Sequence, residues 1–216
     1  MASAPIWRVA PTAAHHAEAL AELTRIVFPT LDPSECFEAD HYRKHVEIFP
    51  EGQFVALPEA PPHTPVASTT TLRLNLDLRR PQHRFPEFLG GLFLTAHDPS
   101  GEWLYGADLG VHPDWRRQGI ARALYAARQT TARELGLRGQ LTVGMLNGYG
   151  AVADRMSAED YYARLVAGEI GDPTVSAQMR IGFRPGGLIP DYVRDPRCGG
   201  YGVLLTLPAD QRVSSR

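Results

Sequence analysis

Residues 109–121, Leu-Gly-Val-His-Pro-Asp-Trp-Arg-Arg-Gln-Gly-Ile-Ala, lead from an apolar stretch through a turn directly into a long amphipathic stretch. The first N–H groups of a helix have no intrahelical partner, and the positive end of the helix dipole attracts phosphate oxygens. Gly119 lacks a Cβ and the small Ala121 follows it, so a ligand can approach the backbone closely. The segment therefore predicts an anion-binding loop, to which three side chains add cationic donors: Arg116, Arg117 and Arg122.

This loop differs from two well-known nucleotide-binding patterns. It lacks the G-x-x-x-x-G-K-[ST] arrangement and the G-x-G-x-x-G arrangement, which disfavours ATP and NAD as ligands. A simpler interpretation stays open, in which residues 113–115 form an ordinary turn and the arginines form a solvated face.

Hydrophobic periodicity predicts strands and helices on both sides of the loop. Strands are expected at residues 6–10, 54–57, 66–74, 103–111, 141–143, 183–189 and 201–207, with 54–57 and 66–74 paired as a hairpin. Helices are expected between Thr12 and Pro29 and at residues 34–48, 119–135, 157–166 and 172–181. Residues 81–100 lack clean periodicity and are expected to form an irregular excursion suited to lining a substrate cleft.

Composition argues against several classes of function. The 22 basic and 24 acidic residues leave a formal charge of -2, so nucleic acid and membranes are not expected partners. The N-terminus lacks the features of a signal peptide and no run of about 18 apolar residues follows, which predicts a cytoplasmic protein. Cys36 and Cys198 lack zinc-like spacing, and His41 and His45 lack an acidic third ligand, so no metal site is predicted.

The pattern Arg116-x-x-Gly119-x-Ala121 resembles the R/Q-x-x-G-x-G/A acetyl-CoA signature of the GNAT superfamily, with Val111-x-Pro113 ahead of it and Gly182-Phe183 downstream. The resemblance implies an α/β (α+β) GNAT fold, with a mixed, mostly antiparallel central sheet of about six to seven strands flanked by helices. One domain over residues 1–216 is expected. The resemblance also implies acetyl-CoA as the acyl-donor cosubstrate and, as acceptor, the primary amine of a small molecule, peptide or protein.

The same resemblance implies which residues hold the cosubstrate. In the family, the strand before the loop pairs with the pantetheine arm, which implies backbone contacts from Leu109, Gly110 and Val111. The loop and the helix start hold the pyrophosphate, which implies contacts from Arg116, Arg117, Gln118, Gly119, Ile120, Ala121 and Arg122.

A narrower resemblance extends to other segments of the chain. Residues 47–56, 105–108, 148–150 and 172–174 look like the acetyltransferase domain that is fused to carbon-nitrogen hydrolases in some bacteria. No hydrolase segment follows them in this sequence, so the domain is expected to stand alone. This resemblance supports the class of activity but identifies no acceptor.

The catalytic residues of the family are replaced in this chain. Many GNAT enzymes carry a glutamate on the strand before the loop, but that register falls on Tyr105, and Asp108 is the only carboxylate of the strand. The family's usual general acid is a tyrosine four residues before the Gly-Phe pair. In this chain that position is occupied by Gln178. Tyr105, Asp108 and Tyr149 are therefore the catalytic candidates, with Tyr161, Tyr192 and Tyr201 as further sources of an acid. Two alternatives stay open. Asp108 could be a structural residue that is hydrogen-bonded to backbone, or catalysis could proceed by approximation of the reactants, with water carrying the protons.

The connection over residues 144–171 is unusually long, and such ordered insertions often serve as lids or binding loops. We expect it to cover the acceptor side of the cleft through Asn147, Tyr149, Asp154, Glu159 and Tyr161, or else to form a homodimer contact. Two functions compete with catalysis. The chain could be a catalytically weak acyl-CoA-binding regulatory module, or a different phosphate-binding domain.

Overall fold

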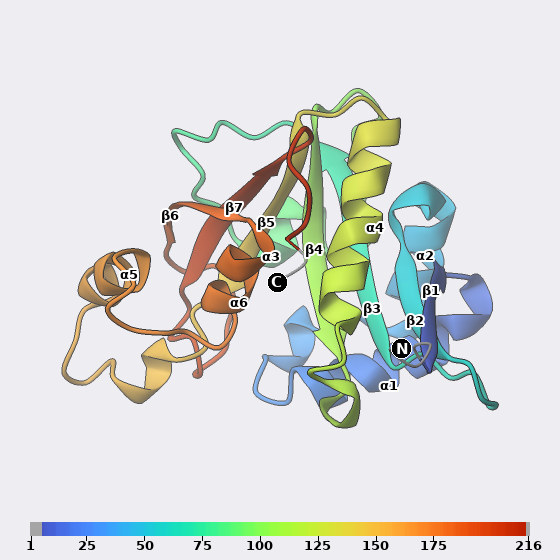
Figure 1. The fold of residues 1–216 in the computed structure, drawn as a ribbon, viewed down its shortest axis with the longest axis horizontal. Coiled ribbons are helices and arrows are strands. Elements are labelled where there is room, and N and C mark those ends of the chain that lie inside the picture. Colours follow the sequence, from blue (N-terminus) through green and yellow to red (C-terminus); the bar gives the residue numbers. More distant parts are fainter. Residues whose placement is uncertain (1–5, 215–216) are drawn as a thin grey trace, which may run out of the picture.

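The computed structural model describes residues 6–214, and within them seven strands form one sheet in the order β1-β2-β3-β4-β5-β7-β6 (Figure 1). The strands are β1 (Trp7–Pro11), β2 (Phe54–Pro58), β3 (Ala67–Leu74), β4 (Trp103–Val111), β5 (Gly139–Met145), β6 (Arg184–Ile189) and β7 (Gly202–Pro208). Neighbouring described strands are antiparallel except for β4 and β5. This confirms the predicted mixed, mostly antiparallel sheet.

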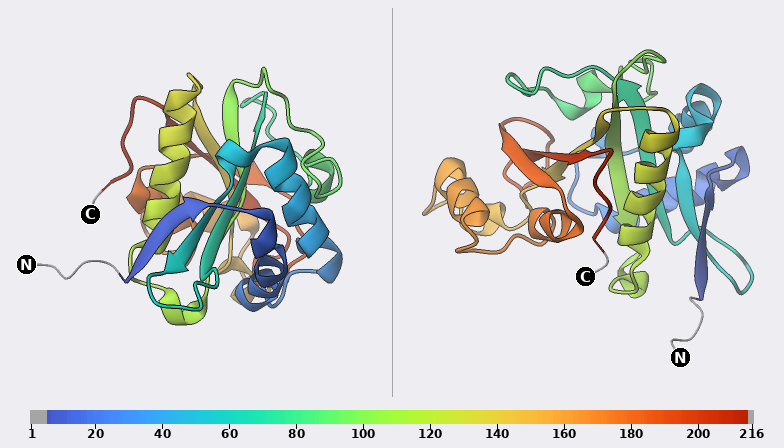
Figure 2. Two further views of the ribbon diagram at one scale, coloured as in Figure 1. Left: turned by 90° about the vertical axis from the view of Figure 1, so that its right-hand side faces the viewer. Right: turned by 45° about the horizontal axis from the view of Figure 1, so that its top comes forward.

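Helices cover both faces of the sheet. They are α1 (Ala17–Val27), α2 (Ala39–Ile48), α3 (Phe85–Phe88), α4 (Ile120–Glu134), α5 (Ala158–Val166) and α6 (Val175–Ile181). Figure 2 shows α4 on one face and α1 with α2 on the opposite face. Short 3-10 turns supplement them: η1 (Ala14–His16), η2 (Pro33–Glu35), η3 (Pro50–Gly52), η4 (Pro113–Trp115) and η5 (Tyr149–Ala151).

The helix predicted at residues 34–48 is interrupted in the structure. The turn η2 ends at Glu35, the next residue Cys36 has an extended backbone, and α2 begins only at Ala39. A tertiary contact explains the break, because the buried Glu35 carboxylate accepts hydrogen bonds from the backbone N–H and the Nε of Arg194 at 2.7 and 3.0 Å. Residues 81–100 are irregular as predicted, apart from the single turn of α3.

No helix among residues 6–214 is long and apolar enough to cross a membrane. The prediction that the N-terminus carries no signal peptide rests on the first residues of the chain, of which 1–5 lie outside the described residues. The cytoplasmic location stays a prediction.

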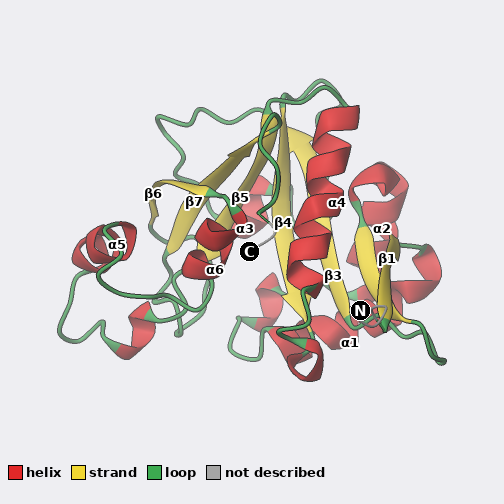
Figure 3. Ribbon diagram, in the orientation of Figure 1, coloured by secondary structure: helices red, strands yellow, loops and turns green. Residues whose placement is uncertain are grey.

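Strands β4 and β5 pair over only part of their length. Their parallel ladder joins Trp103–Gly106 to Gly139–Thr142, and beyond this point the two strands separate into a V (Figure 3). A β-bulge in β4 lies at the branching point, because Thr70 of β3 is opposite Asp108 while Thr71 is opposite Gly106, which leaves Ala107 as the extra residue. Bulges bend the strand that carries them, so the bulge redirects β4 where the V opens.

The fully buried side chain of Arg128 lies under this branching point. Its Nη2 donates to the carbonyl oxygen of Leu141 at 3.2 Å, and its guanidinium lies 5.0 Å from the centre of the Tyr125 ring. Nε and Nη1 have no hydrogen-bond partner among the described residues. Burial lowers the pKa of Arg128, and the nearby Tyr125 and Asp108 oppose that shift. A Cβ on Gly106 would collide with the guanidinium, so the glycine makes room for the buried cation.

We expect Gly106→Ala to lower the free energy of unfolding by about 1–3 kcal/mol, because the added methyl group overpacks a site filled by a buried arginine. Urea unfolding followed by circular dichroism measures the change. Gly171→Ala is the matched control, since the nearest atom to its new Cβ is Ser176 Oγ at 4.0 Å. Equal stability of the two variants would show that Arg128 moves aside without cost.

Candidate active site

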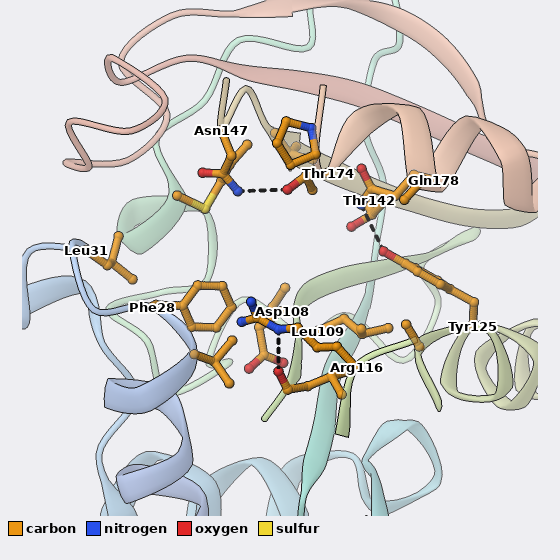
Figure 4. A pocket seen from close by; sticks show the side chains of 18 of the residues that line it. Phe28, Leu31, Asp108, Leu109, Arg116, Tyr125, Thr142, Asn147, Thr174 and Gln178 are labelled. Atoms are coloured by element: carbon orange, nitrogen blue, oxygen red, sulfur yellow. Dashed lines mark hydrogen bonds between the residues drawn. The ribbon is translucent and has the colours of Figure 1, made fainter. Parts of the chain in front are cut away.

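The opening of the V leads into a cavity of about 870 Å³ (Figure 4). One wall is formed by the end of β4 and the start of α4, and the opposite wall by the end of β5 and α6. Residues 24–37 and the β6–β7 loop close the remaining sides. Helices on both faces of the sheet and the last strand connection therefore all reach one cavity, which lies where the two central strands separate.

The predicted anion-binding loop borders this cavity. Arg117 and Gly119 have positive φ angles of 62° and 83°, and the first hydrogen bond of α4 runs from the Ala123 N–H to the Gly119 carbonyl. The amides of Ile120 and Ala121 therefore lie ahead of the hydrogen-bonded part of the helix. A Cβ on Gly119 would meet no atom within 4 Å, so glycine is needed here for its backbone conformation and for access from outside.

Most of the residues predicted to hold the cosubstrate line the cavity. They are Leu109, Val111, Arg116, Arg117, Gly119, Ile120, Ala121 and Arg122. Arg116 Nε also donates to the Val111 carbonyl at 3.1 Å, which ties the loop to the strand. Gln118 is exposed outside the lining, and Gly110 faces Val27 of α1. The roles of all these residues in binding stay predictions.

Of the three catalytic candidates Tyr105, Asp108 and Tyr149, only Asp108 lines the cavity. Its Oδ1 accepts a 2.6 Å hydrogen bond from the Thr70 N–H, and its carbonyl accepts one of 2.7 Å from Thr69 Oγ1. Burial raises the pKa of Asp108 to about 6, although hydrogen bonds from Thr70 and Tyr42 and the nearby Arg128 favour the charged form. The carboxyl group is therefore hydrogen-bonded to backbone, as in the structural role that the sequence analysis left open. Its raised pKa also suits it to accept a proton near neutral pH.

Tyr105 and Tyr149 do not belong to the lining of the cavity. Tyr105 is fully buried and its hydroxyl contacts His83 Nε2 at 2.9 Å and the Tyr192 hydroxyl at 3.0 Å. Tyr192 in turn lines the cavity. Tyr149 packs edge-on against the rings of Tyr161 and Tyr201. Of the two candidates, only Tyr105 is connected to the cavity by a hydrogen bond through a lining residue.

The long connection over residues 144–171 reaches the cavity only near β5. Met145 and Asn147 are lining residues, and Asn147 Nδ2 donates to Thr174 Oγ1 at 2.7 Å. The rest of the segment packs at a distance around α5, in which Ser157 caps the helix as predicted, its hydroxyl accepting from the Asp160 N–H at 3.1 Å. Figure 1 shows α5 at the outer edge of the molecule, away from β4.

Tyr125 and Thr142 are cavity residues that the sequence analysis did not identify. Tyr125 belongs to α4, and its hydroxyl accepts a 2.8 Å hydrogen bond from Gln178 Nε2, so a phenol lies beside the position where the family carries its tyrosine. Thr142 Oγ1 donates to the Gly106 carbonyl at 3.1 Å. The helical spacing of Tyr125 next to the apolar stripe offered a weak signal, but its orientation toward Gln178 depends on how α4 and α6 pack.

The fold and the loop define a class of protein. The model of the acetyltransferase (GNAT) family matches residues 82–153, a segment that contains β4, the anion-binding loop and α4. Together with the sheet order and the V between β4 and β5, this match identifies a GNAT acetyltransferase domain in the chain. The sequence-based assignment to this family is therefore confirmed.

Within the family, two proteins of Bacillus subtilis strain 168 are similar in sequence. The "Probable hydrolase YhcX" is 32% identical over 185 residues, which cover 85% of this chain and 35% of YhcX, so this chain spans about a third of that relative's length. The "Uncharacterized N-acetyltransferase YkwB" is 28% identical over 189 residues, which cover 87% of this chain and 82% of YkwB. The match to part of a larger hydrolase fits the narrower resemblance predicted from the sequence.

Solved structures share the fold. The GphF GNAT-like decarboxylase in complex with isobutyryl-CoA has a TM-score of 0.76 at 23% identity and covers 94% of this chain and 99% of its own. The loading GNATL domain of CurA from Lyngbya majuscula has a TM-score of 0.78 at 15% identity, with coverage of 95% and 99%. The protein yncA from Salmonella typhimurium, solved with its cofactor acetyl-CoA, has a TM-score of 0.56 at 11% identity, with coverage of 98% of each chain.

We expect Gly119→Asp to abolish acetyl-CoA binding measured by calorimetry, because the carboxylate would crowd and repel the pyrophosphate. The fold should persist, since the new side chain meets no atom within 4 Å. Gly136→Asp is the matched control: it lies just after the other end of α4, has a positive φ of 65° and is equally open. Retained binding by the Gly119 variant would refute the assignment of the loop.

Proposed function

We propose that the protein transfers an acetyl group from acetyl-CoA to a primary amine of a small molecule, peptide or protein, with residues 1–216 acting as one catalytic domain. The observation that carries the proposal is the position of Asp108. Its carboxyl group lies in the wall of the same cavity whose rim is formed by the anion-binding loop. A proton acceptor and a site for the phosphates of the donor thus face one space between β4 and β5.

Acetyl-CoA would bind along the open edge of β4. Beyond Gly106, this strand has no ladder partner on the side of β5, so its backbone groups can pair with the amides of the pantetheine arm. The loop that follows would hold the pyrophosphate through the amides at the start of α4. Arginine side chains line this end of the cavity from two helices and the loop: Arg116, Arg117, Arg122 and Arg180. Guanidinium groups are suited to phosphate because they donate in a fixed fork.

The opposite side of the cavity favours a cationic acceptor. Two buried carboxylates, Glu35 and Asp195, belong to its lining. The Asp195 carboxylate accepts from the Thr30 hydroxyl at 2.9 and 3.0 Å and from the Arg197 N–H at 2.7 Å. Because the Glu35 carboxylate is already paired with the guanidinium of Arg194, Asp195 is the carboxylate on this side that can attract a protonated amine.

Asp108 then removes a proton from the ammonium group, and the neutral amine attacks the carbonyl carbon of the thioester. Holding both reactants in one cavity supplies a large part of the rate in such transfers. Because Gln178 Nε2 donates to the Tyr125 oxygen, the phenol hydrogen can turn into the cavity, and we propose that it donates a hydrogen bond to the thioester. The nitrogen keeps the acetyl group and CoA leaves.

We expect acetyl-CoA at a hundredfold excess over its dissociation constant to stabilise the folded protein by about 2.7 kcal/mol. This corresponds to a rise of roughly 5–10 °C in the thermal midpoint for a chain of this size. Differential scanning fluorimetry checks the rise, and thiol release with a panel of primary amines, comprising alkylamines, amino acids and short peptides, checks turnover. The same concentrations of ATP and NAD are the controls.

Three outcomes separate the competing functions. A shift with acetyl-CoA and amine-dependent thiol release supports the acetyltransferase. A shift without thiol release for any amine favours the regulatory CoA-binding module. A shift with a nucleotide but not with millimolar acetyl-CoA would overturn the family-based function.

We expect Asp108→Asn to lower kcat by about 10²-fold or more, since a positioned base contributes on that scale. In the wild type, kcat should fall as the pH drops through about 6, because Asp108 must be ionised and its pKa is raised to about 6. The variant should lose this pH dependence. Asp154→Asn, which alters an exposed carboxylate outside the cavity lining, is the control for a general charge effect.

The free energy of unfolding at two pH values provides a second measurement on the Asp108→Asn variant. A pKa raised in the folded state means that ionisation of Asp108 above pH 6 lowers the stability of the wild type relative to pH 4. Asp108→Asn should therefore be as stable as the wild type at pH 4 and at least as stable at pH 8. A variant that is less stable at pH 8 would indicate that Asp108 serves structure rather than proton transfer.

A further inference from the structure

Three polar side chains from distant parts of the chain form a continuous hydrogen-bonded row behind the cavity wall. His83 Nε2 lies 2.9 Å from the Tyr105 hydroxyl, which lies 3.0 Å from the Tyr192 hydroxyl. Tyr192 is the member that lines the cavity. Tyr105 is fully buried and Tyr192 is 3% exposed, so the contacts between them are shielded from water.

The direction of every hydrogen bond in this row is fixed by a backbone carbonyl. His83 Nδ1 lies 2.6 Å from the Pro81 carbonyl oxygen, which can only accept, so Nδ1 carries the hydrogen. In a neutral ring Nε2 then has a free lone pair, and Tyr105 must donate to it. The Tyr105 oxygen in turn accepts from the Tyr192 hydroxyl, so the Tyr192 oxygen presents lone pairs to the cavity.

We propose that His83, Tyr105 and Tyr192 form a proton relay, in which Tyr192 accepts a proton from the attacking nitrogen and later donates a proton to the sulfur of CoA. The proposal rests on the acetyltransferase function inferred above, and it assigns Tyr192 as the group that touches the substrate. Tyr105 and His83 act through it as positioning residues.

The relay balances the protons of acyl transfer. As the C–N bond forms, the nitrogen gives a proton to the Tyr192 oxygen, the Tyr192 hydrogen moves to Tyr105, and the Tyr105 hydrogen moves to His83 Nε2. Each hydroxyl is now reversed, so the Tyr192 hydrogen faces the cavity. When the C–S bond breaks, this hydrogen passes to the thiolate and the reverse shifts restore neutral His83. The products are the amide and the CoA thiol.

Ring packing holds the three groups in place. The His83 ring stacks on Phe88 of α3 with centroids 3.9 Å apart, and it meets the rings of Tyr105 and Tyr192 edge-on at 5.6 Å each. Relay of a proton needs fixed donors and acceptors, and aromatic contacts on several sides restrict the rotation of all three rings.

The charges around the row favour a neutral resting state. Burial lowers the pKa of His83, and the hydrogen bond to Pro81 raises it in part. Burial raises the pKa of Tyr192 well above its usual range, the hydrogen bond with Tyr105 lowers it in part, and the titratable groups Cys198, Glu35 and Asp108 raise it further. Burial also raises the pKa of Tyr105, while the cation of Arg128 opposes this. At neutral pH the hydroxyls are therefore protonated and the His83 imidazole is free to accept.

Nuclear magnetic resonance of the histidine side-chain nitrogens tests the direction of the row without any acceptor. Two-bond proton–nitrogen spectra show which ring nitrogen carries the hydrogen, and the signal missing from His83→Gln identifies His83. We expect a neutral ring with the hydrogen on Nδ1 at pH 7.5. A hydrogen on Nε2, or a charged ring at that pH, would overturn the relay.

Kinetics test the transfer itself, with the amine that gives the fastest thiol release in the panel. Tyr192→Phe, Tyr105→Phe and His83→Gln should each lower kcat by about 10²-fold or more, with unchanged acetyl-CoA affinity. Tyr162→Phe, which removes a phenol oxygen from α5 outside the cavity lining, should behave as the wild type. Wild-type kcat in Tyr105→Phe and His83→Gln would overturn the relay while leaving the acetyltransferase intact. Absence of thiol release in the wild type with every amine would instead count against the proposed function.

Discussion

The separation of β4 from β5 is the constraint on which the rest of the structure depends. Hydrogen bonding between the two strands stops at Gly106 and Thr142, and the bulge at Ala107 redirects β4 at the same place. The buried guanidinium of Arg128 fills the space beneath this point and bonds to the carbonyl of Leu141 on β5. A buried charge is costly without partners, so this hydrogen bond ties the guanidinium to β5 at the place where the strands separate.

The position of the cavity between β4 and β5 follows from this separation. The unpaired edge of β4 leads directly into the anion-binding loop, so a ligand that pairs with the strand reaches the start of α4 with its phosphates. Arg116, Arg117, Arg122 and Arg180 line that end of the cavity, while Glu35, Asp195 and Arg197 belong to the lining from residues 24–37 and the β6–β7 loop.

The chemistry is distributed differently from the usual arrangement of the family. The strand position of the usual glutamate is held by Tyr105, and the position of the usual tyrosine is held by Gln178. The structure has a carboxylate three residues further along the strand, at the bulge, and a phenol on α4 that contacts Gln178. A functional group of each kind is therefore present in the cavity, although neither stands at the family's position in the sequence.

The sequence alone determined the order of the strands and helices, the family and the loop around Gly119, because these depend on local signals: periodicity, capping residues and a compact motif. It also placed Asp108 in a strand at residues 103–111, which the structure contains as β4. Local signals could not predict that Glu35 would break the second helix by bonding to Arg194, or that His83, Tyr105 and Tyr192 would meet. These residues are separated by 22 to 159 positions, and their contacts arise only when distant elements pack. The tertiary structure alone decided which side chains face the cavity, since a strand or helix pattern specifies a buried face but not the partner that covers it.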